Sequence, residues 1–203
     1  MPFIHEHNLL FVHIPKCGGT SVLKKFNISD NNLNACFRYE ELKYFCEETN
    51  SDLIFSPQHF TPSLIREYYG EFYKLYRKFT IVRNPYTRAI SEYFFREQEV
   101  TEFNDNHFYE WWCKFTLSKC DHLLPQSTYF EDINYDFVLK FESLKRGFNK
   151  MCKDLNIPTG LPHINKSNLN SKSCLPLLSE KSKKFLYDIY IDDFTNFGYK
   201  SLL

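Results

Sequence analysis

The sequence predicts an α/β fold in which a central parallel sheet is flanked by helices, and three observations predict it. Short apolar runs that end at proline or polar residues are typical of buried strands. Segments with helical patterning separate these runs. The chain has 203 residues, which is enough for one domain with a sizeable core. We therefore expect a single α/β domain that spans residues 1–203.

Four short apolar runs are the expected strands, and each ends at residues that stop a strand. The first two end at Pro15 and at residues 56–57 (SP), the third at residues 83–85 (RNP) and the fourth at Glu142. Continuous apolar runs of this length are typical of strands covered on both faces, as in a parallel sheet. The runs cover residues 9–14, 52–55, 79–82 and 136–141.

Segments with helical patterning lie between and after these runs. Pro85 is well placed in the first turn of a helix that runs towards Gln98. Near the end of the chain, Phe185 and Ile189 have the i,i+4 spacing of neighbours on a helix face. The expected helices cover residues 21–26, 40–48, 62–69, 85–98, 107–120, 144–155 and 180–191.

The composition argues against several classes of protein. Lys plus Arg (25) equals Asp plus Glu (25), and 43% of the residues are hydrophobic, so the chain is globular without the basic excess of a nucleic-acid-binding protein. The seven cysteines form no CxxC pair, so neither a zinc knuckle nor a fully paired disulfide framework is indicated. No apolar run is long enough to span a bilayer, and the first residues are not a basic signal peptide. We expect a cytoplasmic protein with no membrane span and no nucleic-acid partner.

A glycine pair follows the first expected strand and precedes an expected helix. Gly18 and Gly19 let backbone N–H groups approach an anion closely, and Thr20 and Ser21 add hydroxyl donors. Lys16 supplies a full positive charge. A glycine pair in isolation is more often a plain tight turn, but the strand before it and the helix after it favour an anion-binding loop.

This loop differs from the phosphate loop of nucleotide triphosphatases. The Walker pattern GxxxxGK[ST] places its lysine after the glycines, whereas Lys16 precedes Gly18 and Gly19. The loop is short enough that we expect it to hold a single phosphate group. No obvious cluster of metal-binding carboxylates accompanies it, so we expect no metal. Both points argue against a small kinase.

The third expected strand is followed by a second candidate anion site. Arg83 ends that strand, and Ser91 lies eight positions further along on the next helix. A planar guanidinium can grip a phosphate with two hydrogen bonds, and a hydroxyl about two helical turns along can complete the contact. Arg88 and Arg96 fit a solvated helix face instead, because Arg88 and Glu92 have the i,i+4 spacing of a surface ion pair.

The two loops together resemble those of a known family. Residues 11–21 (FVHIPKCGGTS) and 81–91 (IVRNPYTRAIS) resemble the 5′-phosphosulfate and 3′-phosphate loops of carbohydrate sulfotransferases, which use 3′-phosphoadenosine 5′-phosphosulfate (PAPS). Four weaker motifs follow in the order seen in the branch that includes heparan sulfate 2-O-sulfotransferases and chondroitin sulfotransferases. This resemblance covers nearly the whole chain and implies a nucleotide-kinase-like, P-loop-type sulfotransferase fold. The weaker motifs are residues 122–126 (HLLPQ), 141–144 (FESL), 161–167 (LPHINKS) and 190–199 (YIDDFTNFGY).

The resemblance implies a role for each matching residue. Cys17 stands where the family usually has threonine, but contacts from neighbouring backbone N–H groups are expected to preserve binding. Lys166 or Ser167 is expected to contact the nucleotide from a segment that closes over it, although a polar surface linker is the alternative for that segment. The 5′-phosphosulfate is expected to be bound by Lys16, Cys17, Gly18, Gly19, Thr20 and Ser21, and the 3′-phosphate by Arg83 and Ser91.

Sulfuryl transfer to an alcohol needs a cation at the bridging oxygen and a base for the alcohol proton. Lys16 is the expected cation. His59 resembles the histidine that 2-O-sulfotransferases place near the acceptor, and a neutral imidazole suits proton abstraction near neutral pH, although some family members use a glutamate. We expect His13 to be a satisfied core or supporting histidine, whereas His122 and His163 are candidates for lining the acceptor cleft.

We therefore predict a PAPS-dependent sulfotransferase that moves a sulfuryl group to a hydroxyl on a carbohydrate, without a metal, and releases adenosine 3′,5′-bisphosphate (PAP). One alternative is a small nucleotide-dependent kinase, for which ATP with magnesium would be the preferred ligand. The other is a catalytically inactive relative that binds nucleotide or glycan without forming product. The sequence leaves the acceptor, the position sulfated and the oligomeric state open.

Overall fold

The computed structural model describes residues 3–28, 56–118, 120–162 and 170–203, and it confirms the α/β class. Its sheet has the strand order β1 (Phe3–Ile4), β2 (Leu9–Val12), β3 (Arg77–Val82) and β4 (Phe137–Lys140). The last three strands are parallel and correspond to three of the expected runs. The expected strand at 52–55 and the expected helix at 40–48 lie outside the described residues.

The edge strand β1 was not predicted from the sequence. It has only two residues, which pair antiparallel with Leu10 and Leu9 of β2. The chain reverses between β1 and β2 through a short 3₁₀ helix, and Asn8 takes a left-handed conformation at φ 49°. Two residues are too few to show a periodic pattern, so the sequence carries no signal for this strand.

The buried strands are the ones with the clearest apolar runs. All four residues of β2 and the last four residues of β3 are buried, whereas β4, at the edge of the sheet, buries only Leu139. In the register, Phe11 of β2 lies beside Phe79 of β3, and Ile81 lies beside Leu139. The parallel pairing brings the carboxyl ends of β2, β3 and β4 to one edge of the sheet.

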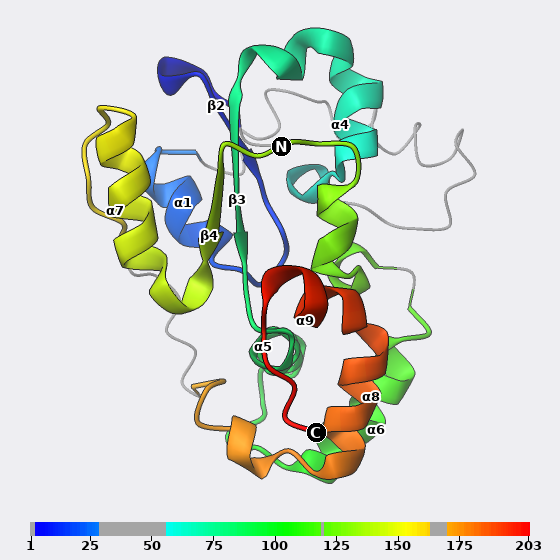
Figure 1. Cartoon of the computed structure of the whole chain (residues 1–203). Helices are drawn as coiled ribbons and strands as arrows, with labels where there is room; N and C mark the ends of the chain where they lie inside the picture. The colour runs from blue at the N-terminus through cyan, green and yellow to red at the C-terminus, as the bar shows by residue number, and fades with distance from the viewer. Residues whose placement is uncertain (1–2, 29–55, 119, 163–169) are drawn as a thin grey trace.

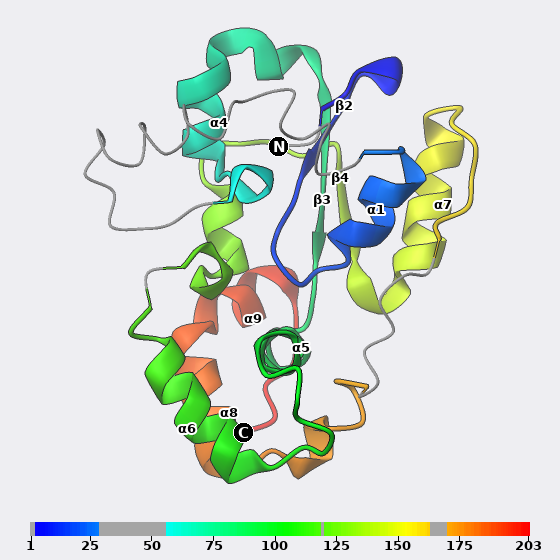
Figure 2. The same cartoon turned by 180° about the vertical axis from the view of Figure 1, so that it is seen from behind.

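Helices cover the sheet on both sides and extend beyond that edge. Helices α1 and α7 lie on one side of the sheet and α4 lies on the other, while α5, α6, α8 and α9 gather below the carboxyl ends of β2 and β3 (Figures 1 and 2). The bounds are α1 (Gly19–Lys25), α4 (Pro62–Tyr69), α5 (Pro85–Arg96), α6 (Asp105–Phe115), α7 (Leu144–Asp154), α8 (Glu180–Ile189) and α9 (Ile191–Phe197). Short 3₁₀ helices connect them: η1 (His5–His7), η2 (Pro57–His59), η3 (Gly70–Leu75), η4 (Asp121–Leu123), η5 (Gln126–Phe130), η6 (Phe141–Ser143) and η7 (Leu175–Leu177).

Most of the expected helices are confirmed within a few residues, and α9 is an addition. The expected helix at 180–191 ends at Ile189, and α9 then begins after a break at Tyr190. Asn84 begins α5, because its side chain accepts a hydrogen bond from the Thr87 N–H and Pro85 occupies the first turn. Among the described residues, no helix is long and apolar enough to cross a membrane.

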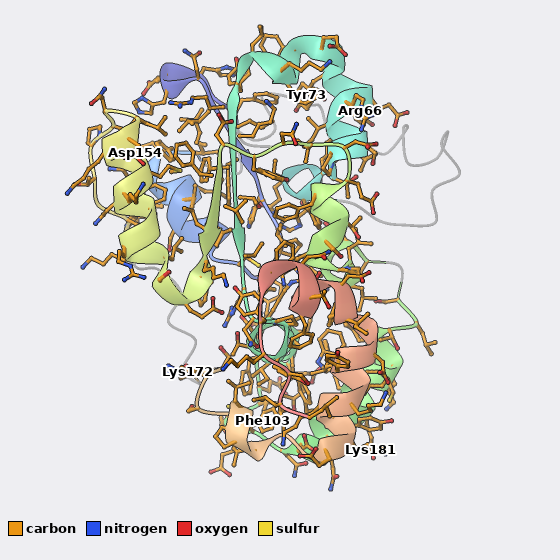
Figure 3. All side chains as sticks on the ribbon, viewed as in Figure 1. Arg66, Tyr73, Phe103, Asp154, Lys172 and Lys181 are labelled. Atoms are coloured by element: carbon orange, nitrogen blue, oxygen red, sulfur yellow. The ribbon has the colours of Figure 1, made fainter. Side chains whose placement is uncertain are left out.

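Aromatic side chains build two hydrophobic cores. One lies around the sheet, and the other lies among α5, α6, α8 and α9, where side chains pack densely around α5 (Figure 3). Trp112 and Tyr93 are buried in this second core, and Phe103 packs against it. Because α5 starts at the end of β3 and passes into the second core, it holds the two cores together and fixes the edge where the site is found.

Candidate active site

A cavity of about 1090 Å³ lies at the carboxyl edge of the sheet. Each parallel strand is followed by a residue that lines it: His13 after β2, Arg83 after β3 and Phe141 after β4. Further lining comes from η2, from one face of α5 and from the first turn of α7. Ligands of open α/β sheets bind in this position, beyond the carboxyl ends of the strands.

The glycine loop takes the strained path expected of a close backbone approach. Lys16 has φ 64° and Gly18 has φ 90°, both in the left-handed region, and α1 begins directly afterwards at Gly19. A Cβ atom on Gly19 would lie 1.8 Å from Nε2 of His13, so only glycine fits there. Gly18, Gly19, Thr20 and Ser21 all line the cavity.

Cys17 departs from this group because its side chain does not line the cavity. The thiol is buried and donates to Oε1 of Gln126 at 3.4 Å and to the carbonyl of Pro15 at 3.5 Å. Burial raises the pKa of Cys17 to about 12, so the thiol stays protonated. The Cys17 side chain therefore supports the loop from behind rather than facing a ligand.

Lys16 lines the cavity as a cation without a carboxylate partner among the described residues. Its Nζ lies 3.7 Å from the centroid of the Phe95 ring. The pKa of Lys16 is lowered to about 8, chiefly by burial; Glu92 opposes this shift, and the nearby charges of Arg83 and Arg96 contribute to it. An anion that enters the cavity would stabilise the charged form of this ammonium and so raise its pKa.

Arg83 is buried and held on several sides, with its guanidinium 4.1 Å from the Phe141 ring centroid. Its Nη1 donates to the carbonyl of Lys16 at 2.8 Å, and its Nη2 donates to Oγ of Ser171 at 2.6 Å. Burial lowers the pKa of Arg83 to about 10, which leaves it charged at neutral pH. Arg83 and Ser91 line the same cavity as the glycine loop, so the structure brings the two predicted anion loops together.

The interpretation of Arg88 as part of a solvated helix face is wrong. Arg88 is only 3% exposed. Its guanidinium donates to the carbonyls of Pro15, Leu124 and His122 at 3.1, 3.0 and 3.1 Å, rather than to Glu92. Arg88 thus ties the glycine loop to the 122–124 segment, and it is Arg96 that pairs with Glu92, at 2.8 Å.

We expect Arg88→Met to destabilise the fold by about 3 kcal/mol or more, because it leaves three carbonyls in a buried region without their donor. Urea unfolding measures this change. Arg66→Met is the control, because Arg66 is exposed and its ion pair in the described part of the chain is with exposed Asp132, so it should change stability by less than about 0.5 kcal/mol. Equal stability of the two variants would contradict this role for Arg88.

His59 lines the cavity from η2 and is paired with Asp121, a residue that the sequence did not single out. Nδ1 of His59 lies 2.9 Å from Oδ2 of Asp121, and both side chains are 5% exposed. The N–H of Ser56 donates to the same oxygen at 2.9 Å. Burial lowers the pKa of His59, and the bond to Asp121 opposes this effect. Burial also raises the pKa of Asp121, but the bonds from His59 and Ser56 hold it below its ordinary value.

A second imidazole–carboxylate pair stands beside the first. Nδ1 of His122 lies 2.7 Å from Oε2 of Glu92, whose other oxygen accepts from Arg96. The ring centroids of His59 and His122 are 5.0 Å apart, and His122 lines the cavity, a position that suits a residue of the acceptor cleft. Atoms of His59, Asp121 and His122 lie within 4.8 Å of one another, a grouping that can hold a metal ion, but the hydrogen bonds to the two carboxylates already account for it.

His13 is buried, as expected, but it is not satisfied. Its Nδ1 has no hydrogen-bond partner in the described part of the chain. The ring lies against Gly19, its centroid is 4.7 Å from that of His59, and it lines the cavity. Burial lowers the pKa of His13 well below its ordinary value, so the imidazole is neutral near neutral pH.

The weak motifs meet in hydrogen bonds that hold the site from behind. Gln126 of HLLPQ brackets the Arg83 backbone, accepting from its N–H and donating to its carbonyl, each at 2.8 Å. Asp193 of YIDDFTNFGY accepts from the Gln126 N–H at 2.9 Å. Glu142 of FESL accepts from the Tyr199 hydroxyl at 2.9 Å. The predicted contacts of Lys166 and Ser167, and His163 beside them, lie outside the described residues.

Fold and site together define the class: an α/β protein whose strand-edge cavity combines the two loops predicted to bind anions with a buried, carboxylate-held imidazole. A model of the sulfotransferase family matches residues 3–200, so the chain belongs to the sulfotransferase family. This match confirms a sulfotransferase family and is consistent with the predicted fold, without distinguishing the branch of the family. No curated protein and no solved structure matches the chain significantly.

Proposed function

We propose that this protein is an enzyme that transfers a sulfuryl group from PAPS to a hydroxyl of a carbohydrate. The observation that carries the proposal is that one cavity is lined by the glycine loop, by Arg83 with Ser91, and by His59. Membership of the sulfotransferase family supports sulfuryl transfer in general. The donor, the acceptor class and the base are our assignments, as is a single sulfotransferase domain over residues 1–203.

The donor contacts follow from the lining of the cavity. We assign the 5′-phosphosulfate to Lys16 and to the loop from Gly18 to Ser21, and the 3′-phosphate to Arg83 and Ser91. Cys17 takes no direct part through its side chain, because the thiol points to Gln126. We also assign a contact with the nucleotide to Lys166 and Ser167, and this assignment rests on the sequence motif alone.

The chemistry is an in-line displacement at sulfur. The acceptor oxygen forms a bond to sulfur while the bond from sulfur to the bridging oxygen of the donor breaks, which leaves PAP. Negative charge builds on that bridging oxygen, and Lys16 stabilises it. His59 takes the acceptor proton. Because its Nδ1 is held by Asp121, the Nε2 atom carries the free electron pair that accepts this proton.

We expect Arg83→Lys to weaken PAP binding by about tenfold to a hundredfold, because a planar two-bond grip on a phosphate becomes a single point contact. Isothermal titration calorimetry with PAP measures the change. Arg77→Lys is a matched control, because Arg77 is exposed at the first position of β3, whereas Arg83 follows the last, and Arg77 pairs with Asp136. Unchanged affinity in Arg83→Lys would contradict the assigned phosphate contact.

The experiment that tests the proposed function is a transfer assay with PAPS and a broad panel of hydroxyl acceptors, analysed by mass spectrometry for PAP and for sulfated product. We expect PAP and product in equal amounts. PAP binding without product from any acceptor would indicate an inactive relative. A preference for ATP with magnesium and a phosphorylated product would indicate a kinase.

A further inference from the structure

One face of α5 lines the cavity and extends along it towards Gln98. Ser91, Phe94, Phe95 and Gln98 are spaced by three and four residues, so they lie along one side of the helix and its C-terminal extension. Ser91 lies near the middle of α5, and Arg83, which provides the proposed phosphate contact, lies just before the helix begins. From Ser91 to Gln98 the helical rise is about 10 Å, so Gln98 lies well beyond Ser91 on the way from Arg83, whereas the Phe95 ring lies beside the Lys16 ammonium.

The fixed positive charge of the cavity lies at the donor end. Besides Lys16 and Arg83, the described lining contains the cations Lys145 and Arg146, both in the first turn of α7. This turn lies against the glycine loop, because a Cβ atom on Gly18 would be 3.1 Å from the side chain of Leu144. These cations therefore stand where the donor phosphates are proposed to bind.

Apart from Lys16, which is assigned to the donor, the cavity lining around His59 has no cation among the described residues. Its lining beyond the histidines and Lys16 consists of amide and aromatic side chains: Gln58, Phe94, Phe95 and Gln98. The nearby cations Arg88 and Arg96 are engaged, the first by three carbonyls and the second by Glu92.

The charges behind this end are negative. Asp121 and Glu92 lie directly behind the two imidazoles, bonded to His59 and His122. A polyanionic chain placed here would find no unpaired cation other than Lys16 among the described residues, because Arg96 is already paired with Glu92, and this disfavours it.

We infer that the acceptor is an uncharged sugar rather than a polyanionic glycan. The inference rests on the proposed function and names the substrate class of the same site. Phe95 is 49% exposed and adds apolar aromatic surface to this end of the cavity, beside the Lys16 ammonium that lies 3.7 Å from its ring centroid and the His122 ring that stacks against it. The amides of Gln58 and Gln98 each provide donors and an acceptor for sugar hydroxyls.

The test compares three acceptor classes with PAPS and the wild-type chain: neutral oligosaccharides, unsulfated but carboxylated glycosaminoglycan chains, and aromatic alcohols including tyrosyl peptides. We expect neutral oligosaccharides to give a kcat/KM at least about tenfold above the other two classes, with little dependence on salt because no ion pairs are formed with the acceptor. A preference for the polyanion with a steep loss of rate at higher salt would overturn the inference, and so would a preference for aromatic alcohols.

Two variants test whether Gln98 contributes to binding of the acceptor. We expect Gln98→Ala to raise KM for the neutral sugar severalfold while PAP affinity stays unchanged, because Gln98 lies away from the phosphates. Glu99→Ala is the matched control, since the neighbouring Glu99 is exposed and does not line the cavity. Equal KM values in the two variants would remove Gln98 from the acceptor site. A protein that binds no PAP and sulfates no acceptor would refute the proposed function itself, an outcome distinct from sulfation of the wrong class.

Discussion

Lys16→Ala is expected to lower kcat/KM for sulfuryl transfer by about a hundredfold to a thousandfold, because it removes the charge that stabilises the leaving oxygen. In the structure this ammonium lines the cavity over the Phe95 ring and has no carboxylate partner among the described residues. PAP release measured under single-turnover conditions reports the loss. Lys24→Ala on α1 is a matched control, because Lys24 is exposed outside the cavity lining, and its rate should equal that of the wild type.

The same lysine predicts a pH dependence of binding. Its pKa of about 8 in the free protein means that Lys16 loses its proton as the pH rises through 8. A bound phosphate favours the charged form and raises that pKa, so PAP binding takes up a proton, and affinity falls as the pH rises above 8. Calorimetry of PAP binding across this range measures the effect. A Lys16→Ala variant with the same pH profile as the wild type would contradict it.

His59→Gln is expected to lower turnover by about a hundredfold to ten-thousandfold while PAP affinity is unchanged, because it removes the base and no phosphate contact. Asp121→Asn is expected to lower turnover by at least about tenfold, since the carboxylate that holds His59 Nδ1 is replaced by a neutral amide. His107→Gln serves as the control, because His107 bonds to Tyr93 and does not line the cavity.

The pH profile separates a positioning role of Asp121 from a merely structural one. Burial lowers the pKa of His59 from 6.5, so the acid limb of kcat/KM in the wild type lies below pH 6.5. Asp121 opposes this shift, so Asp121→Asn should move the acid limb to still lower pH.

If His59→Gln keeps its turnover while His13→Gln loses it, the base is His13, whose ring lies beside that of His59.

The parts of the fold that the sequence predicts are those with strong local signals. The parallel strands β2 and β3 are nearly continuous apolar runs because both of their faces are buried, and α5 is marked by its Asn84 cap and Pro85. The sequence gives no signal for β1, because a strand of two residues is too short to show an alternating pattern. α9 was not predicted: the expected helix at 180–191 runs through the break at Tyr190, which no glycine or proline marks, and stops where α9 begins.

In the site, too, the residues that the sequence predicts are those with strong local signals. The anion loops were predictable because a glycine pair and an arginine that directly follow buried strands are typical of phosphate-binding positions, and they do line one cavity. Asp121 was missed because its partner His59 is distant in sequence, and only the fold brings the two together. Arg88 was misread because i,i+4 spacing predicts an ion pair on a free helix, whereas burial of α5 against the glycine loop gives its guanidinium three carbonyls instead.

The most direct test of the central claim, that both anion loops bind one PAPS-type nucleotide, is a thermal-shift titration with PAP beside AMP, ADP and ATP with magnesium. At about 100 times its dissociation constant, a ligand that binds only the folded state adds about 2.7 kcal/mol of stability, which raises Tm by several degrees. We predict a shift of this size with PAP and a much smaller one with AMP, which lacks the 3′-phosphate that Arg83 and Ser91 are assigned to bind. No shift with PAP, or a larger one with ATP and magnesium, would contradict the assigned donor.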